Sequence, residues 1–212
     1  MRFAVFVSGS GTNLQALIDS CQRSDAASVV LVVSDRPGIG ALERAARAGI
    51  ARAVLDDYND PSAIMSILTG HTIDFIVLAG YLRLIPGEVV RGYDGRMINI
   101  HPALLPSFGG KGMYGRKVHE AVIASGAKVT GPTIHLVTGE YDRGLILAQW
   151  PVPVHSGDTP DTLAARVLET EHRLLPAVVE SIARHGPGHF QFTFSEFQSD
   201  SPTNVLDTQN NC

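Results

Sequence analysis

The N-terminal half of the chain alternates between short apolar runs and segments with helical spacing, and this alternation restricts the possible folds more than any other feature. Most of the runs are apolar at consecutive positions, as in parallel strands that helices cover on both faces. Between them, apolar residues recur at the i, i+3, i+4 spacing of one helix face. The pattern predicts an α/β fold with a Rossmann-like, open, mostly parallel sheet and helices on both faces. The predicted strands cover residues 3–7, 29–33, 51–55, 75–79 and 97–100.

Beyond Pro102 this alternation stops. A glycine-rich stretch at residues 109–115 precedes a predicted helix at residues 117–124. Two apolar runs, at residues 133–138 and 145–150, then flank a polar turn. Such a pair predicts an antiparallel hairpin near the C-terminal part of the sheet.

A long helix is expected to follow the hairpin, with Thr159 or Asp161 as its N-cap. Pro176 lies within its apolar stripe, and we expect this proline to kink the helix or to end its first part. Residues 1–186 are predicted to form a single domain. Phenylalanines that alternate with polar residues follow it, so residues 187–212 are predicted to form an edge strand and a polar, partly disordered tail.

The composition restricts the class of partner. A hydrophobic content of 44% and a charged content of 18% are those of an ordinary globular protein. The net charge of −4 argues against nonspecific nucleic-acid binding, and no apolar run approaches the ~20 residues of a membrane span. Two isolated cysteines and an N-terminus too short for a signal peptide favour a cytoplasmic setting. We expect small-molecule substrates and a monomer or homodimer.

Glycines and small hydroxyls at residues 8–13 end the first strand and open the first helix. Backbone N–H groups at a helix N-terminus suit a phosphate. Leu14 stands where the dinucleotide fingerprint needs its third glycine, and no nucleotide P-loop lysine follows. The segment therefore favours a single phosphate monoester, with a tight turn capped by Thr12 or Asn13 as the alternative.

Asn99 and His101 end the fifth predicted strand, at the sheet edge where ligands bind in open parallel sheets. An amide and an imidazole can stabilise an oxyanion, and a carboxylate from the polar turn can hold the imidazole protonated and receive a proton. This set suits transfer of an acyl group to an amine that attacks by itself. Spacing does not decide between Asp142 and Glu140 as that carboxylate, and the alternative for His101 is a structural turn histidine.

The other histidines are spread along the chain, and none has the spacing of a zinc site. We interpret His119 and His135 as packed or surface residues, and we expect no metal. Residues 78–85 place apolar side chains beside Arg83. They could line a flat heteroaromatic ring, although core packing beside a surface arginine is the simpler interpretation.

Taken together, these motifs resemble the folate-dependent glycinamide ribonucleotide formyltransferase family over the chain to about Arg184. The matching segments occur in the family's order and at its approximate spacing. The resemblance implies a formyltransferase fold over residues 1–186, with 10-formyltetrahydrofolate as co-substrate and glycinamide ribonucleotide as acceptor. The segments are residues 7–16, 78–83, 99–106, 129–135, 142–144 and 152–154.

The resemblance also implies roles for individual residues. It gives Asn99, His101 and Asp142 as the catalytic residues, with Asp142 raising the pKa of His101. Residues implied for the ribonucleotide are Gly11, Thr12, Asn13, Pro102, Leu168, Glu169, Thr170 and Glu171. Residues implied for the folate are Leu82, Arg83, Leu84, Ile85, Asn99, Thr138, Gly139, Glu140, Tyr141 and Asp142.

One departure concerns the folate's carboxylate tail. Some family members carry a folate-contacting arginine before the Leu-Ala-Gly motif, but no Lys or Arg occurs from Ala53 to Leu82 here. Two other functions compete with transfer to the ribonucleotide. A 10-formyltetrahydrofolate hydrolase usually adds an N-terminal regulatory domain, whereas this sequence starts on the first strand. A catalytically silent sugar-phosphate or folate-binding protein would not need Asn99, His101 and Asp142 together.

Overall fold

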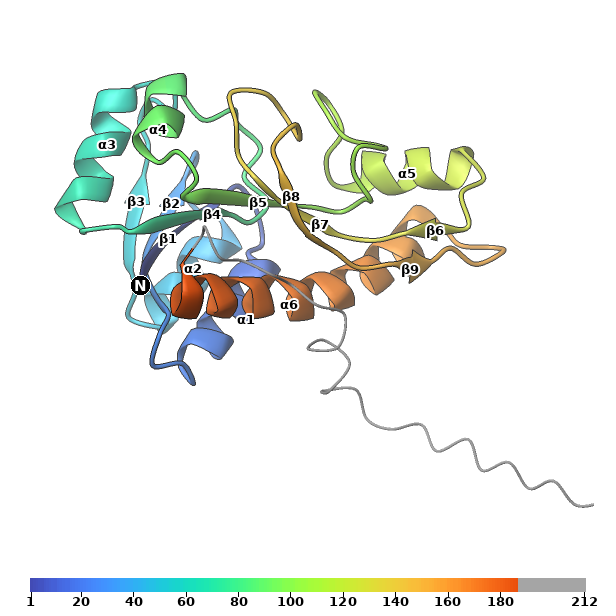
Figure 1. Cartoon of the computed structure of the whole chain (residues 1–212), viewed down its shortest axis with the longest axis horizontal. Coiled ribbons are helices and arrows are strands. Elements are labelled where there is room, and N and C mark those ends of the chain that lie inside the picture. The colour runs from blue at the N-terminus through green and yellow to red at the C-terminus, as the bar shows by residue number, and fades with distance from the viewer. Residues whose placement is uncertain (187–212) are drawn as a thin grey trace, which may run out of the picture.

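The predicted alternation of strands and helices is confirmed in residues 1–186, the part of the chain that this computed structural model describes. The expected edge strand and tail, in residues 187–212, lie outside it. Figure 1 shows the sheet running through the middle of the molecule. The strands are β1 (Arg2–Val7), β2 (Ser28–Ser34), β3 (Ala51–Val54), β4 (Phe75–Leu78), β5 (Met97–His101), β6 (Val129–Thr130), β7 (Thr133–Leu136), β8 (Ile146–Gln149) and β9 (Val152–Pro153).

In the described part of the chain, the main sheet has seven strands in the order β3-β2-β1-β4-β5-β7-β8. β1 to β5 are parallel, and β7 and β8 extend the sheet as an antiparallel hairpin. The mostly parallel sheet with its hairpin is as predicted. The strand order reverses direction at β1 and β4, which places the loops after these strands at the edge where open sheets bind ligands.

Within residues 1–186, six helices join the strands, and their bounds are α1 (Thr12–Cys21), α2 (Gly40–Arg47), α3 (Pro61–Gly70), α4 (Gly87–Gly92), α5 (Arg116–Ala124) and α6 (Pro160–His185). No periodic pattern predicts α4, which has only six residues. The small antiparallel pair β6–β9 is not predicted either, because its strands have two residues each.

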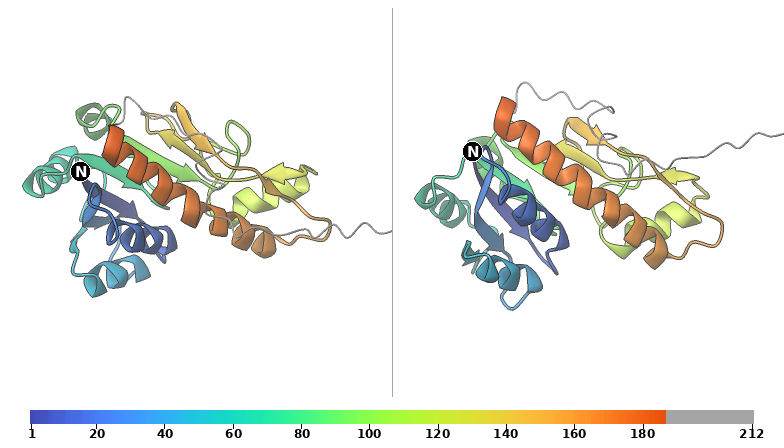
Figure 2. Two further views of the ribbon diagram at one scale, coloured as in Figure 1. Left: turned by 60° about the horizontal axis from the view of Figure 1, so that its bottom comes forward. Right: turned by 90° about the horizontal axis from the view of Figure 1, so that it is seen from below.

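Alternate residues of β1 point into two different cores, as the period of a strand requires. Phe3, Val5 and Val7 pack with apolar residues of α1, α2 and α6. Ala4 and Phe6 face the opposite side, where α3 and α4 cover the sheet. Figure 2 shows α6 and α1 lying side by side along one face of the sheet.

Helix α6 runs through Pro176 as one element of 26 residues. The expectation that this proline ends the first part of the helix is therefore wrong. Pro176 lacks the N–H that would complete a helical hydrogen bond, but it is buried beside Leu174, Leu175 and Val178. Burial of this apolar stripe offsets the missing bond. Thr159 is the N-cap and forms a capping box with Thr162.

Candidate active site

The last strand of the parallel set carries two of the expected catalytic residues. Asn99 and His101 occupy alternate positions in β5 and lie on the same face of the sheet. Asn99 is paired with His135 across the β5–β7 ladder. The strand end thus brings a histidine from a distant segment next to Asn99.

Asp142 reaches His101 through the turn between β7 and β8. Its backbone adopts a left-handed conformation with φ 56°, which Asp tolerates better than most residues. A Cβ at Gly144 would lie 1.6 Å from the carbonyl oxygen of Leu136. The close approach of the turn to β7 therefore requires glycine at position 144.

The turn places Asp142, and not Glu140, beside the imidazole. Asp142 Oδ2 lies 3.6 Å from His101 Nδ1 and accepts a hydrogen bond of 2.8 Å from the backbone N–H of Gly110. Its side chain is 9% exposed, whereas Glu140 is exposed to solvent. Burial acts to raise the pKa of Asp142, but interactions with His135, His101 and the Gly110 N–H outweigh it and leave the pKa below its usual value. Asp142 is thus a buried, ionised carboxylate.

Both ring nitrogens of His101 have partners in the structure. Nε2 donates to the carbonyl oxygen of Phe108 at 2.9 Å, and Nδ1 faces Asp142. The net effect lowers the pKa of His101, because burial outweighs the raising effects of Asp142 and the Phe108 carbonyl. Asp142 acts to raise this pKa, as expected, but burial has the larger effect, so the pKa of His101 lies below its usual value.

His135 is more than a packed residue. Its Nδ1 lies 2.8 Å from the carbonyl oxygen of Leu136, so this nitrogen carries the proton. Its Nε2 lies 3.1 Å from Asn99 Nδ2 and 3.5 Å from Asp142 Oδ1. Asn99 Nδ2 also lies 3.5 Å from Asp142 Oδ1. These contacts orient the Asn99 amide, and both His135 and His119 line the same cavity.

That cavity has a volume of about 870 Å³ and opens beside His101, Asn99 and Asp142. Large apolar side chains at its wall, among them Leu82, Leu84 and Tyr141, are partly exposed. Apolar walls with a few convergent polar groups are typical of small-molecule sites. All residues expected for the folate lie on the wall except Gly139. The glycine-rich loop from Gly110 to Gly115 also forms part of the wall.

Of the α6 residues expected for the ribonucleotide, only some line the cavity. Leu168 and Glu171 are three residues apart and share the helix face toward the cavity, which Asn13 and Pro102 also line. Glu169 and Thr170 line neither this cavity nor the second one described below. Position within a helical turn explains the difference, since adjacent residues point in different directions.

Glu171 is the most deeply buried carboxyl group of the site, with 7% of its surface exposed. Its Oε2 accepts a hydrogen bond of 2.7 Å from Asn13 Nδ2. Burial raises the pKa of Glu171 to about 7, and the Asn13 bond only partly offsets this. Asn13 Oδ1 is buried without a hydrogen-bond partner among the described residues. The pair therefore presents an acceptor and a titratable carboxyl group to the cavity.

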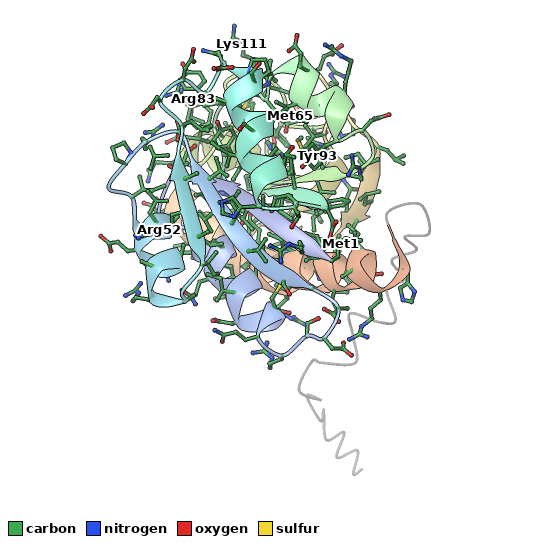
Figure 3. The ribbon with its side chains drawn as sticks, turned by 90° about the vertical axis from the view of Figure 1, so that its left-hand side faces the viewer. Met1, Arg52, Met65, Arg83, Tyr93 and Lys111 are labelled. Atoms are coloured by element: carbon green, nitrogen blue, oxygen red, sulfur yellow. The ribbon has the colours of Figure 1, made fainter. Side chains whose placement is uncertain are left out.

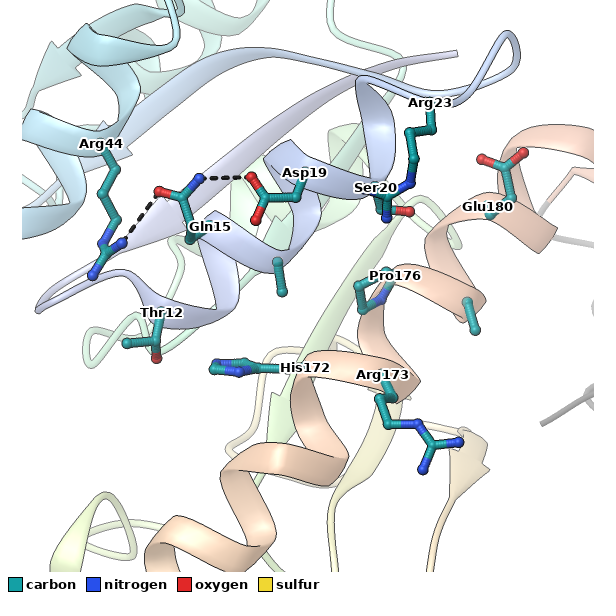
Figure 4. Close-up of a pocket in the computed structure, with 12 residues that line it drawn as sticks. Thr12, Gln15, Asp19, Ser20, Arg23, Arg44, His172, Arg173, Pro176 and Glu180 are labelled. Carbon is teal, nitrogen blue, oxygen red and sulfur yellow. Dashed lines mark hydrogen bonds between the residues drawn. The ribbon is translucent and has the colours of Figure 1, made fainter. Parts of the chain in front are cut away.

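A second cavity, of about 750 Å³, lies between α1 and α6. Figure 4 shows Thr12, Arg44 and His172 at one end of it, and Arg23 and Glu180 at the other. Arg44 bonds the Ser10 carbonyl and Gln15. The N-terminal turn of α1 is thus accessible beside a cationic side chain, as an anion site needs.

Gly11 has a structural role in this turn. Its φ is +74°, and a Cβ there would lie 2.6 Å from the Cβ of Ala41 in α2. Glycine at position 11 lets the turn pack directly on α2.

Two negative findings apply to residues 1–186. No group of three or more His, Cys, Asp or Glu side chains is placed to hold a metal ion. No helix in this range is long and apolar enough to cross a membrane.

Comparison with known proteins shows the family of this chain. The family model described as formyl transferase matches residues 1–179, and the chain belongs to the formyl transferase family. The chain is 47% identical over 189 residues to the chloroplastic phosphoribosylglycinamide formyltransferase of Arabidopsis thaliana, covering 85% of this chain and 65% of the plant protein. It is 42% identical to the trifunctional purine biosynthetic protein adenosine-3 of Gallus gallus, covering 86% of this chain and 18% of that protein.

Solved structures agree with this assignment. The phosphoribosylglycinamide formyltransferase of Bacillus halodurans superposes with a TM-score of 0.81 at 36% identity, covering 91% of this chain and all of that one. The Brucella melitensis enzyme of the same name gives 0.78 at 43% identity, with 86% and 95% covered. The resemblance to glycinamide ribonucleotide formyltransferases is confirmed. The chain spans only 65% and 60% of the length of two plant relatives.

Proposed function

We propose that the protein transfers the formyl group of 10-formyltetrahydrofolate to the amino group of glycinamide ribonucleotide, N1-(5-phospho-D-ribosyl)glycinamide, in purine biosynthesis. The arrangement of Asn99, His101 and Asp142 on the wall of one cavity carries the proposal. The similar proteins named above support it, because their names state this reaction or purine biosynthesis. No metal ion is part of the proposed reaction.

The reaction forms one bond to the formyl carbon and breaks another. The substrate amine attacks that carbon, and the C–N10 bond of the folate then breaks. The amine loses one proton, and N10 gains one. Between the two steps the formyl oxygen carries negative charge, which Asn99 Nδ2 and His101 can stabilise by hydrogen bonds. Asp142 counteracts the effect of burial on the pKa of His101. It can also accept the amine's proton, directly or through water.

The two cavities suggest where each substrate binds. The pteridine ring of the folate occupies the apolar wall formed by residues 82–85 and the turn of residues 138–142. The ribonucleotide extends from Asn99 past Glu171 and Asn13, and its phosphate meets the backbone N–H groups at Thr12 and Asn13. This arrangement puts the amine next to the formyl carbon, and such positioning accounts for much of the rate in a direct transfer.

A single-turnover absorbance assay with 10-formyltetrahydrofolate tests the proposal. We expect tetrahydrofolate to form rapidly when glycinamide ribonucleotide is present and not in its absence. Equal rates with and without the ribonucleotide would instead identify a hydrolase. Binding of either compound without turnover would identify a silent binding protein.

The compartment and the assembly state belong to the proposal as well. We expect a cytoplasmic enzyme, monomeric or homodimeric, whose partners are its small-molecule substrates. The plant relatives are named as chloroplastic, so fractionation of the source cells is the test of the compartment. Light scattering at several concentrations tests the assembly state.

A further inference from the structure

His119 is a buried histidine on the wall of the larger cavity, and the proposed reaction gives it no role. It is the fourth residue of α5, is 4% exposed and lines the cavity together with His101. Its Nδ1 is enclosed and has no hydrogen-bond partner among the described residues. Its Nε2 is not enclosed in this way, so Nε2 is the ring nitrogen that faces the cavity.

The surroundings of His119 keep its ring neutral. Burial lowers the pKa of His119, and the neighbouring His101 lowers it further. An imidazolium would also enclose an N–H group at Nδ1 without an acceptor, which costs free energy. Among buried backbone groups, N–H groups without an acceptor are rarer than acceptors without a donor. The same preference places the single proton of the neutral ring on Nε2, so His119 offers the cavity a hydrogen-bond donor.

The packing of α5 does not depend on the imidazole. Val118 and Val122 are fully buried and pack with Leu163 and Val167 of α6. These apolar contacts hold the helix in place. An unpaired ring nitrogen at the neighbouring buried position costs free energy that an apolar side chain would avoid. The imidazole of His119 therefore fits a role toward a ligand better than a role in packing.

The position of α5 places His119 near the part of the cavity expected to hold the ribonucleotide. Figure 3 shows Arg83, on the wall expected for the folate, at the same end of the molecule as Lys111 of the glycine-rich loop. Helix α5 follows this loop and packs against α6, which carries Glu171. His119 is therefore near both His101 and the helix expected to bind the ribonucleotide.

The ribonucleotide carries a neutral acceptor in the matching place. In the proposed arrangement its phosphate lies at the first turn of α1 and its amine lies at His101. A carboxamide joins the ribose to the carbon that bears the amine. Once water is excluded, the carbonyl oxygen of this carboxamide needs a hydrogen-bond donor from the protein. A neutral donor suits it, because a cation beside the amine would repel any protonated amine.

We propose that Nε2 of His119 donates a hydrogen bond to the carboxamide oxygen of glycinamide ribonucleotide and so recognises the glycinamide part of this substrate. The inference rests on the proposed function, since it assumes this ribonucleotide in the cavity. His119 is then a binding residue that is separate from the groups that hold the phosphate. It favours the ribonucleotide over sugar phosphates that lack the carboxamide, because those leave the donor unpaired.

Calorimetric titrations with two ligands test the proposal without requiring turnover. The ligands are glycinamide ribonucleotide and ribose 5-phosphate, which lacks the carboxamide. His119→Asn withdraws the N–H group from the position of Nε2. It is expected to weaken ribonucleotide binding about three- to tenfold and ribose 5-phosphate binding less than about twofold. His119→Gln, whose amide N–H extends closer to that position, is expected to retain most of the affinity. The control, His155→Asn, changes an exposed residue outside both cavities and should alter neither ligand's binding.

Kinetics and NMR distinguish the carboxamide oxygen from the formyl oxygen as the acceptor. A hydrogen bond that is equally strong in the ground state and the transition state affects the KM for the ribonucleotide, so His119→Asn should raise this KM and leave kcat nearly unchanged. A bond to the formyl oxygen, whose charge grows in the transition state, would lower kcat instead. NMR of the 15N-labelled wild type is expected to show the proton of His119 on Nε2. This signal should shift with the ribonucleotide and not with ribose 5-phosphate.

Equal losses for both ligands in His119→Asn, or no loss at all, overturn the inference, and so does a proton on Nδ1. A fall in kcat with an unchanged KM assigns His119 to the formyl oxygen and overturns it as well. Unfolding midpoints show whether each variant is folded. If His119→Asn does not fold, the response of the wild-type Nε2 signal to the two ligands decides. A protein that binds the ribonucleotide as expected but transfers no formyl group contradicts the proposed function and leaves the His119 contact standing.

Discussion

Nε2 of His101 lies 2.9 Å from the carbonyl oxygen of Phe108, while Nδ1 of the same ring faces Asp142 at 3.6 Å. A carbonyl oxygen only accepts hydrogen bonds, so Nε2 carries a proton. A formyl oxygen that receives this proton, or a hydrogen bond from it, must therefore take the place of Phe108 as the acceptor. Gly110 from the same loop donates to Asp142, which couples the loop to both catalytic candidates.

Asp142→Asn is expected to lower the pKa of His101 further. Burial already holds this pKa below its ordinary value, and Asp142 is the largest opposing influence. Removing the charge leaves burial less opposed, so His101 stays neutral to a lower pH. NMR titration of the ring measures the midpoint. Glu140→Gln is the matched control, and an Asp142→Asn midpoint equal to that of the wild type would show that Asp142 does not tune His101.

Glu171 is expected to make stability depend on pH. Its pKa is raised from 4.5 to about 7 in the folded state, so the folded protein holds the proton more tightly than the unfolded chain. The stabilisation is complete below pH 4.5 and is lost as the pH rises through about 7.

Glu171→Gln removes this dependence. The free energy of unfolding of the wild type should fall relative to the variant, by at most about 3 kcal/mol, between these pH values. Urea unfolding at several pH values measures it. Glu169→Gln changes an exposed neighbour on the same helix. Its curve of unfolding free energy against pH should run parallel to that of the wild type. A Glu171→Gln curve that also stays parallel would mean that Glu171 is ionised in the folded protein.

Thr12→Val is expected to weaken binding of the ribonucleotide but not of the folate. The substitution keeps the shape of the side chain and removes a hydroxyl at the proposed phosphate site, which should raise the KM for the ribonucleotide about tenfold. Gly11 is a poor test, because any Cβ there meets Ala41 and disturbs packing. Steady-state kinetics with Thr69→Val, an exposed threonine of α3, provide the comparison. Equal rises in both KM values for Thr12→Val would point to damage to the fold.

Lys111→Ala is expected to reduce folate affinity a few-fold at most, and mainly at low ionic strength. Lys111 is exposed on its loop, and exposed charge pairs contribute only ~0–1 kcal/mol and are screened by salt. Titrations at low and high salt, with the exposed Lys128→Ala as control, measure the effect. A larger loss that persists at high salt would show that Lys111 is covered by the ligand.

The sequence predicted the central part of the fold because local patterns carry it. Runs of consecutive apolar residues fix β1, β2 and β4, and the position of His101 at the end of a strand follows from them. The register between β5 and β7 is a long-range property, so the pairing of Asn99 with His135 could not be predicted. Local patterns therefore do not distinguish His135 from a packed or surface residue.

Other features depend on contacts that no local pattern contains. Arg36 follows β2 and Arg83 follows β4, and only the neighbouring ends of these strands reveal that both bind Asp35. Burial likewise distinguishes Asp142 from the exposed Glu140 as the carboxylate beside His101. Burial also lowers the pKa of His101, although the sequence predicts that Asp142 raises it. The continuity of α6 through Pro176 depends on the packing of its buried face.

His101→Ala gives the most direct test of the central claim, that this imidazole stabilises the formyl oxygen during direct transfer to the amine. In single-turnover assays the variant is expected to transfer the formyl group at least ~100-fold more slowly than the wild type. Its affinity for glycinamide ribonucleotide, measured by calorimetry, should stay within about twofold. Near-normal transfer by the folded variant would contradict the assignment of His101.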